Sequence, residues 1–248
     1  MFGVGGVELA YLTAVFLLGG FVKGVISFGL PLVTVPLLSQ IFPVPVAITL
    51  TLVSVLVSSV VQAYLCRRAY PILRQVWPLI LPIGATIPVA ALAAGTVDPT
   101  TLNLAIGVFI EVLVAVQWIG MRSAPPRRHR GLVLAAGGVL SGVFGGVTSF
   151  YSFPSVQMLV GMKLNRTEFA LSTNVMFLVG SGSLAYSMSA LGLYTRTNVA
   201  LSLWGLVPLL AGLAAGQILR DRIPQETFRK MVLVMLALTG VSLIHRGL

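Results

Sequence analysis

The chain has 248 residues, of which 57% are hydrophobic and 9% are charged, and its formal net charge is +10. A soluble domain of this size could not bury so much apolar surface, so the composition indicates an integral membrane protein. The basic residues gather between apolar runs, which is typical of membrane loops and argues against a nucleic-acid-binding surface. With one Cys and two His, we expect neither an internal disulfide nor a metal site.

The first apolar segment starts without Lys or Arg, so it lacks the basic region of a cleavable signal peptide and is predicted to stay as a helix. It continues into ISFGLPLVTVP at 26–36, where Gly29 and Pro31 predict a bend. Proline is tolerated at the start of a helix, so a second leg is expected at 31–41. Such a leg rises about 16 Å, roughly half the hydrocarbon thickness, and would begin near mid-membrane.

Three ordinary spans are predicted next, at about 45–66, 76–95 and 101–121. The second half repeats this order with a Gly-rich segment, GVFGGVTSFYSFP, and spans at about 169–190, 198–219 and 229–246. We therefore expect about eight hydrophobic segments in an all-α fold. The predicted parts are a first membrane repeat at 1–121, a basic cytoplasmic linker at 122–130 and a second membrane repeat at 131–248.

An internal repeat supports this division. GGFVKGV at 19–25 aligns with GGVLSGV at 137–143, and Pro36 meets Pro154 in the same register. With a short insertion, AITLT at 47–51 meets ALSTN at 170–174, and Pro82 falls opposite Pro208. No single match is strong, but their common order indicates two homologous halves.

The basic loops distinguish two topologies for these halves. If each Gly-rich segment crosses once, the halves are parallel and the basic residues near 163–166 and 220–230 lie outside. If each folds back to the side it entered from, the halves are inverted and most Lys and Arg are cytoplasmic. The positive-inside rule favours the inverted repeat, with re-entrant Gly-rich segments and the amino terminus outside.

The two broken segments are the predicted substrate site. Non-helical backbone at membrane depth is tolerated where it faces protein or a watery cavity, and helix amino-terminal ends attract anions. Glycine lets a ligand approach the backbone, and hydroxyls can bind oxyanions without holding them tightly. The alternative is that these small residues only allow close helix packing. The candidates are Ser27, Gly29, Thr34, Gly145, Gly146, Thr148, Ser149, Tyr151 and Ser152.

Three further polar residues fall within predicted membrane segments. Asn174 takes the place of Thr51, either as a ligand contact or as a hydrogen bond between helices. Lys23 and Glu111 are the charges placed well inside the membrane, where ionisable groups are costly and commonly functional. They are predicted to pair with each other, or Glu111 carries a coupling proton; Lys23 alternatively snorkels to the interface.

These Gly-rich segments, each with a following proline and repeated in two halves, resemble the TauE/SafE family of sulfite exporters. The resemblance covers about Val7 to Ile244. It implies a bacterial or archaeal inner-membrane permease for small organic or sulfur oxyanions such as sulfite, sulfoacetate or related sulfonates, without a prosthetic group. Ser27 and Phe28 stand where the second half has Gly145 and Gly146, so the second motif is the better match.

Other functions were weighed against transport. An enzyme is not expected, because the spans carry no paired carboxylates and no metal-ligand motif. A non-transporting subunit or scaffold does not explain two matched breaks. A passive anion channel remains as an alternative within the transport class. The predicted mechanism is alternating access of one repeat against the other; the oligomeric state does not follow from the sequence.

Overall fold

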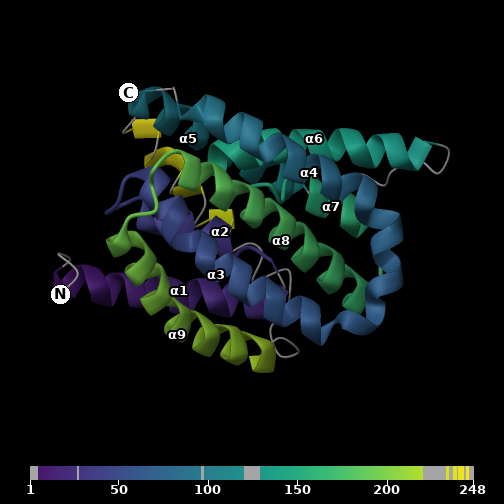
Figure 1. Ribbon diagram of the computed structural model, residues 1–248, viewed down its shortest axis with the longest axis horizontal. Helices are drawn as coiled ribbons and strands as arrows, with labels where there is room; N and C mark the ends of the chain where they lie inside the picture. Colours follow the sequence, from purple (N-terminus) through teal and green to yellow (C-terminus); the bar gives the residue numbers. More distant parts are fainter. Residues whose placement is uncertain are drawn as a thin grey trace. The chain divides into compact units, whose positions relative to one another are not determined.

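The computed structural model is all-helical in the part of the chain that it describes, as expected from the sequence. It describes residues 5–26, 28–95, 98–119 and 129–219, together with 233–234, 237–238, 240–242 and 244–245. In chain order the helices are α1 (Gly6–Ile26), α2 (Leu30–Leu38), α3 (Val44–Leu65), the 3-10 helix η1 (Arg67–Ile72), α4 (Leu73–Ala94), α5 (Pro99–Ile119), α6 (Arg130–Thr148), α7 (Ser155–Gly161), α8 (Arg166–Ala190) and α9 (Arg196–Leu219), as labelled in Figure 1.

Six of the described helices are long and apolar enough to cross a bilayer. Large apolar side chains such as Val207 and Leu132 are strongly exposed on them, as expected for surfaces that lipid covers. The chain is therefore a multi-pass membrane protein. The predicted span at 229–246 lies mostly outside the described residues. The six spans are Gly6–Val25, Val44–Leu65, Arg67–Ala94, Arg130–Thr148, Arg166–Ala190 and Arg196–Leu219.

The chain forms two compact units, and each combines segments from both halves of the sequence. Unit 1 consists of Met1–Ser54, Val97–Ile119 and Met188–Leu248, and unit 2 of Val55–Thr96 and Gly120–Ser187. Helices α3 and α8 each contribute to both units. The division into homologous halves at 1–121 and 131–248 concerns sequence descent, and it stays a prediction.

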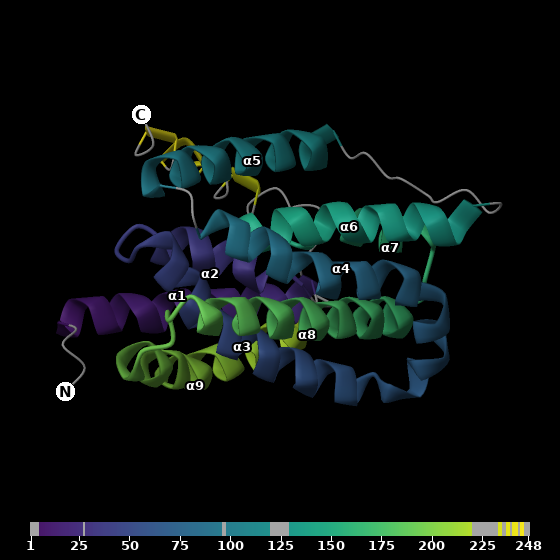
Figure 2. The same cartoon turned by 45° about the horizontal axis from the view of Figure 1, so that its top comes forward.

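In unit 1, α1 packs closely along α9, and the two helices lie side by side in both Figure 1 and Figure 2. A Cβ atom at Gly20 would overlap the carbonyl oxygen of Leu209. A Cβ atom at Gly24 would overlap that of Leu213, one turn further along α9. Backbones that approach this closely require glycine at the crossing.

Unit 2 makes the corresponding contact between α6 and α4. A Cβ atom at Gly138 would overlap the carbonyl oxygen of Leu79, and one at Gly142 would lie 3.0 Å from that of Ile83. Gly20 and Gly138 are aligned in the sequence repeat, so the first helix of each half packs on a helix of the other half. This contact pairs Leu79 with Leu209. Pro208 directly precedes Leu209 and Pro78 directly precedes Leu79, so Pro208 corresponds to Pro78. The sequence alignment pairs Pro208 with Pro82 instead.

Candidate functional site

The first half folds into a helical hairpin, α1–α2, within unit 1. A Cβ atom at Gly19 would meet Thr34 and the side chain of Leu30 on α2. Nearer the start of α1, the Tyr11 hydroxyl donates a hydrogen bond to the Leu37 carbonyl oxygen at 2.9 Å. These contacts run in opposite directions along the two helices. The short helix α2 therefore returns along α1.

The second half forms the same kind of hairpin, α6–α7, within unit 2. Gly137 lies against Met158, and the Ser141 hydroxyl accepts a hydrogen bond from the Ser155 N–H at 3.1 Å. Gly137 is the sequence counterpart of Gly19, so the two hairpins share one construction. In each half, a glycine on the long helix admits the short helix.

The bend of the first hairpin lies at Gly29, as the sequence predicts. Gly29 has φ 92°, a left-handed conformation that glycine adopts without steric cost, and it precedes α2 directly. Pro31 stands in the first turn, and no side chain caps the amino-terminal end of α2. The residues of this turn are buried. Ser27, a candidate site residue, lies outside the described residues.

Lys23 is a buried basic residue of this hairpin. It follows Gly19 by one helical turn, so it leaves α1 on the face that packs against α2. Only 1% of its surface is exposed. Ser141 stands at the aligned position of the second hairpin and contacts the first residue of α7.

The bend of the second hairpin falls later than expected. Helix α6 continues through Gly145 and Gly146 to Thr148, and the chain turns at Ser149, which has φ 67°. The Ser149 N–H donates to the Gly145 carbonyl oxygen at 2.8 Å and closes the last turn of α6. The break in the Gly-rich segment GVFGGVTSFYSFP therefore lies at Ser149 and not at the Gly145–Gly146 pair, because hydrogen bonding within the helix continues past both glycines.

Gly145 and Gly146 serve packing contacts in this structure. A Cβ atom at Gly145 would overlap Tyr151, and one at Gly146 would lie 2.6 Å from Ala90 and 2.7 Å from the Ile87 carbonyl oxygen. Both contacts need a residue without a side chain. Close packing, the alternative weighed from the sequence, accounts for both glycines.

Tyr151 is fully buried inside unit 2. Its ring packs at 5.2 Å from that of Phe177 and also against Gly180, where a Cβ atom would lie 2.7 Å from the ring. Its hydroxyl lies 3.4 Å from the Phe177 carbonyl oxygen. The aromatic ring therefore joins α6 to α8, with its hydroxyl turned to protein groups.

The hydroxyls around the second bend are largely engaged by nearby backbone. Thr148 donates to the Phe144 carbonyl oxygen at 2.7 Å and accepts from the Phe150 N–H at 3.2 Å. Ser155 donates to the Tyr151 carbonyl oxygen at 2.7 Å. The Ser152 carbonyl oxygen accepts from Val156 at 2.9 Å. The first turn of α7 is thus closed by the protein's own groups.

Thr34 and Asn174 occupy buried positions in different units. The Thr34 hydroxyl donates to the Leu30 carbonyl oxygen at 2.9 Å and accepts from Thr51 at 3.1 Å. The Asn174 amide donates to the Ala170 carbonyl oxygen at 2.7 Å, which fixes its orientation. Its carbonyl oxygen Oδ1 then accepts no hydrogen bond from the described residues. Asn174 therefore keeps an available acceptor at a fully buried position.

Glu111 lies on α5 in unit 1, where its carboxylate oxygen Oε1 rests against Gly240. This oxygen is buried and accepts no hydrogen bond from the described part of the chain. The pairing of Glu111 with Lys23 stays a prediction. Among the described residues, no group of His, Cys, Asp and Glu could hold a metal ion.

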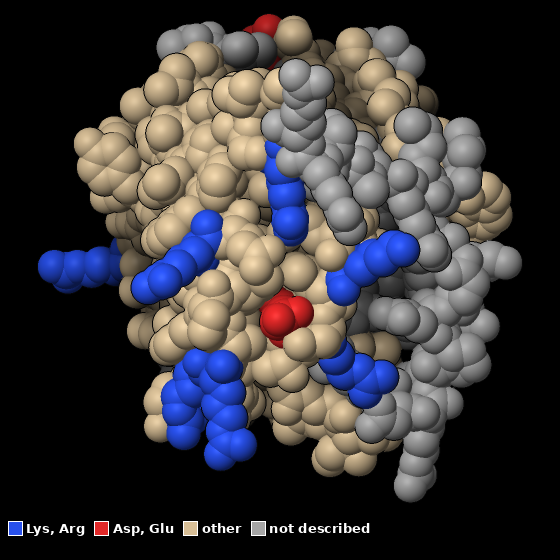
Figure 3. Space-filling model, turned by 90° about the vertical axis from the view of Figure 1, so that its right-hand side faces the viewer, with Lys and Arg blue, Asp and Glu red and all other residues tan. Residues whose placement is uncertain are grey.

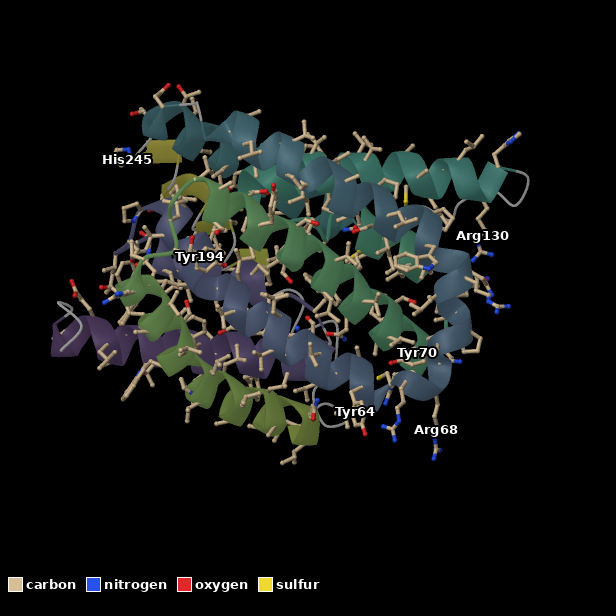
Figure 4. All side chains as sticks on the ribbon, in the orientation of Figure 1. Tyr64, Arg68, Tyr70, Arg130, Tyr194 and His245 are labelled. Atoms are coloured by element: carbon tan, nitrogen blue, oxygen red, sulfur yellow. The ribbon has the colours of Figure 1, made fainter. Side chains whose placement is uncertain are left out.

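The basic residues of unit 2 gather at one end. An apolar cluster there joins Ile72 and Leu73 to Leu164 and Leu171, and Arg130 donates to Gln75 at 3.4 Å. The α6–α7 hairpin therefore begins and ends at the same end of unit 2. Figure 3 shows Lys and Arg side chains spread over this face, and Figure 4 labels Arg68 and Arg130 there. The described basic residues of unit 2 are Arg67, Arg68, Arg74, Arg130, Lys163 and Arg166.

Two features of the site were not predicted from the sequence. The first is Ser141, and the signal that could have found it is the serine that stands opposite Lys23 in the repeat alignment. The second is a set of buried polar residues on α3.

The comparisons with known proteins agree with the resemblance seen in the sequence. The family model described as sulfite exporter TauE/SafE matches residues 12–243. No curated protein and no solved structure matches the chain. The family match covers nearly all of the helices described above, and members of this family are membrane transporters. The chain belongs to the sulfite exporter TauE/SafE family.

Proposed function

We propose that the protein is a membrane permease for small sulfur-containing or organic oxyanions, and that the anion binds at the start of α2 beside Lys23. Sulfite, sulfoacetate and related sulfonates are the proposed substrates. The observation that carries this proposal is the burial of Lys23 in the α1–α2 hairpin, whose short helix α2 begins without a side-chain cap.

The physical argument rests on the charges at this position. An ammonium group removed from water is costly unless an opposite charge or several hydrogen bonds compensate it. The amino-terminal end of α2 adds N–H donors that no side chain caps, together with the positive end of the helix dipole. An oxyanion at the start of α2 would accept hydrogen bonds from these donors, and the buried Lys23 lies in the same hairpin. Gly29 leaves room for it, because no Cβ atom stands at the bend.

The second hairpin is proposed to act mainly as a structural counterpart. Its corresponding helix start is occupied by Ser141, and its hydroxyls are engaged locally. Within unit 2, Ser149, Ser152 and the free acceptor of Asn174 are the proposed anion contacts. An acceptor suits a proton on the substrate, such as that of hydrogen sulfite, better than a bare anion oxygen.

The basic end of unit 2 supports the inverted-repeat topology. A hairpin that begins at Arg130 and ends before Arg166 brings these residues to the side of Arg67 and Arg68. Parallel halves would separate them across the membrane. With this end cytoplasmic by the positive-inside rule, the amino terminus lies outside and the protein resides in the inner membrane. Alternating access of the two repeats follows as the proposed mechanism.

Coupling to protons is proposed to involve Glu111. Its carboxylate lies within a predicted membrane segment and has an unpartnered oxygen against Gly240. If Glu111→Gln retains proton-driven flux at the wild-type rate, this part of the proposal is wrong. A matched Glu168→Gln variant, at the exposed start of α8, controls for loss of charge.

The proposal is tested by reconstituting the purified protein in liposomes and following labelled sulfite, with and without a pH gradient. Unlabelled sulfoacetate, sulfate and acetate serve as competitors. We expect saturable counterflow that sulfoacetate reduces more than acetate does. Flux that neither saturates nor shows counterflow would indicate a passive channel. No flux above that of empty liposomes, from protein shown to be folded, would indicate a non-transporting subunit.

A further inference from the structure

The turn between α3 and α4 in unit 2 is the short amphipathic helix η1. In a 3-10 helix, side chains three residues apart share a face. Ala69 and Ile72 therefore lie on one face, and both pack into an apolar cluster that includes Leu171 of α8. Arg67 and Tyr70 share another face and are exposed. The apolar face fixes η1 on the protein, and the charged face is left for the surroundings.

This turn lies at the depth of the lipid headgroups. Helix η1 stands between the end of α3 and the start of α4, so it marks one end of two membrane spans. The candidate span Arg67–Ala94 includes η1 and has 28 residues, whereas about 20 residues cross the hydrocarbon core. Its charged residues, Arg67, Arg68 and Arg74, all stand near its start. The surplus length therefore extends into the interfacial layer at the η1 end.

Tyrosines flank the arginines of this turn. Tyr64 is 62% exposed and Tyr70 is 52% exposed, as is typical of aromatic residues at a membrane interface. The guanidinium of Arg67 lies 4.3 Å from the centroid of the Tyr64 ring and donates a hydrogen bond to the Tyr64 carbonyl oxygen at 3.2 Å. A guanidinium has five N–H donors, so most of them stay available for a phosphate. Figure 4 labels Tyr64, Arg68 and Tyr70 at this turn.

The positive charge at this end of unit 2 is not balanced by the protein. Glu168 is the single acidic residue in the sequence of unit 2, against the six described basic residues named above. Its carboxylate accepts a hydrogen bond from the Asn165 N–H at 3.0 Å, at the start of α8. In Figure 3, Lys and Arg side chains spread around an acidic side chain on this face. At headgroup depth, anionic lipids supply the missing negative charge.

The surface next to this turn is apolar on both helices. Val61 and Leu65 of α3 and Trp77 and Leu81 of α4 are exposed. Acyl chains cover such side chains in a bilayer. Arginines at headgroup depth beside an exposed apolar surface fit a phospholipid, which carries a phosphate and acyl chains in one molecule. A soluble phosphate would use the arginines alone.

We propose that the η1 corner, made of Tyr64, Arg67, Arg68, Tyr70 and Arg74, binds an anionic phospholipid. The arginines bind the headgroup phosphate, the two tyrosines lie beside the glycerol, and the acyl chains lie on the exposed surface of α3 and α4. This site lies entirely within unit 2 and is independent of the anion that the protein transports.

The test measures lipid binding to the full-length protein in detergent by native mass spectrometry, with phosphatidylglycerol and phosphatidylcholine in equal amounts. The η1 variant combines Arg67→Gln, Arg68→Gln and Arg74→Gln. The matched control removes the same charge from the same end of unit 2 and combines Arg130→Gln, Lys163→Gln and Arg166→Gln. Melting temperatures check that both are folded. Arg68→Gln alone, at an exposed position, replaces the triple change if that variant does not fold.

The wild type is expected to bind phosphatidylglycerol at least about tenfold more tightly than phosphatidylcholine, because several basic residues attract the anionic headgroup together. The η1 variant should lose at least about fivefold of this preference, and the control should stay within about twofold of the wild type. Arg68→Gln alone should lower the preference by about threefold to fivefold, as expected for one charge.

Equal losses in the two triple variants would overturn the inference, because they would show attraction spread over the whole face instead of a site at η1. A wild type without preference for phosphatidylglycerol would overturn it as well. Soluble glycerol 3-phosphate serves as a competitor. If it displaces phosphatidylglycerol at equal concentration, the acyl chains add nothing to binding and the site is not a lipid site.

Discussion

The α1–α2 and α6–α7 hairpins have the same construction but differ at the residue that faces the short helix. In the second hairpin Ser141 binds the first N–H of α7, and Ser155 and Thr148 bond to nearby backbone. In the first hairpin the aligned residue is the buried Lys23, and α2 starts without a side-chain cap. The repeated glycines maintain the packing in both halves, while one changed position places a buried lysine in the first half.

The largest expected effect tests the shared construction. Gly20→Ala and Gly138→Ala each place a Cβ atom on a carbonyl oxygen of the packed helix. We expect each change to lower the free energy of unfolding by about 3 kcal/mol, at the upper end of overpacking effects. Thermal unfolding in detergent measures this, with Gly182→Ala as control, because nothing lies within 4 Å of that position. A loss in one half only would contradict equivalent roles for the two glycines.

The two bends are expected to respond in opposite directions. Gly29→Ala forces an alanine into a left-handed conformation and should cost about 1–2 kcal/mol. Ser149→Gly removes that strain at the other bend and should leave stability unchanged or raise it by up to about 1 kcal/mol. Melting temperatures of both variants check this. A stabilising Gly29→Ala would show that the bend at α2 is not the one described.

A smaller effect is expected at Tyr151. Tyr151→Phe keeps the ring against Phe177 and removes a hydroxyl whose hydrogen bond is long, at 3.4 Å. We expect a stability loss below about 1 kcal/mol and unchanged sulfite counterflow. If this variant melts as the wild type does but has lost saturable counterflow, the Tyr151 hydroxyl contacts the substrate after all.

The sequence was sufficient to predict the all-helical membrane fold, most helix positions and the bend at Gly29. These features follow from hydropathy, from the tolerance of proline in the first turn of a helix and from glycine's conformational freedom, all of which are local properties. The aligned glycines of the repeat also lie at corresponding helix crossings, because a close crossing tolerates no side chain.

The remaining features depend on tertiary packing. The bend at Ser149 could not be located from the sequence. The Gly145–Gly146 pair before it does not reveal that contacts with Tyr151 and α4 keep both glycines within helix α6. The sequence alignment pairs Pro82 with Pro208, whereas the packing of α4 and α9 pairs Pro78 with Pro208. The register follows from the carbonyl oxygens of Leu79 and Leu209, which meet the aligned glycines of α6 and α1. Pro36 likewise lies inside α2, whereas Pro154 directly precedes α7, so the prolines at the starts of the short helices are Pro31 and Pro154.

The central claim is that Lys23 gives the first hairpin its anion site. The most direct test is equilibrium binding of labelled sulfite to purified Lys23→Ser, which places the residue of the second hairpin in the first, with Ser141→Ala as the matched control. We predict that binding falls at least about tenfold in Lys23→Ser, since a charge-assisted contact is lost, and stays near wild type in Ser141→Ala. Wild-type sulfite affinity in a folded Lys23→Ser protein would contradict the claim.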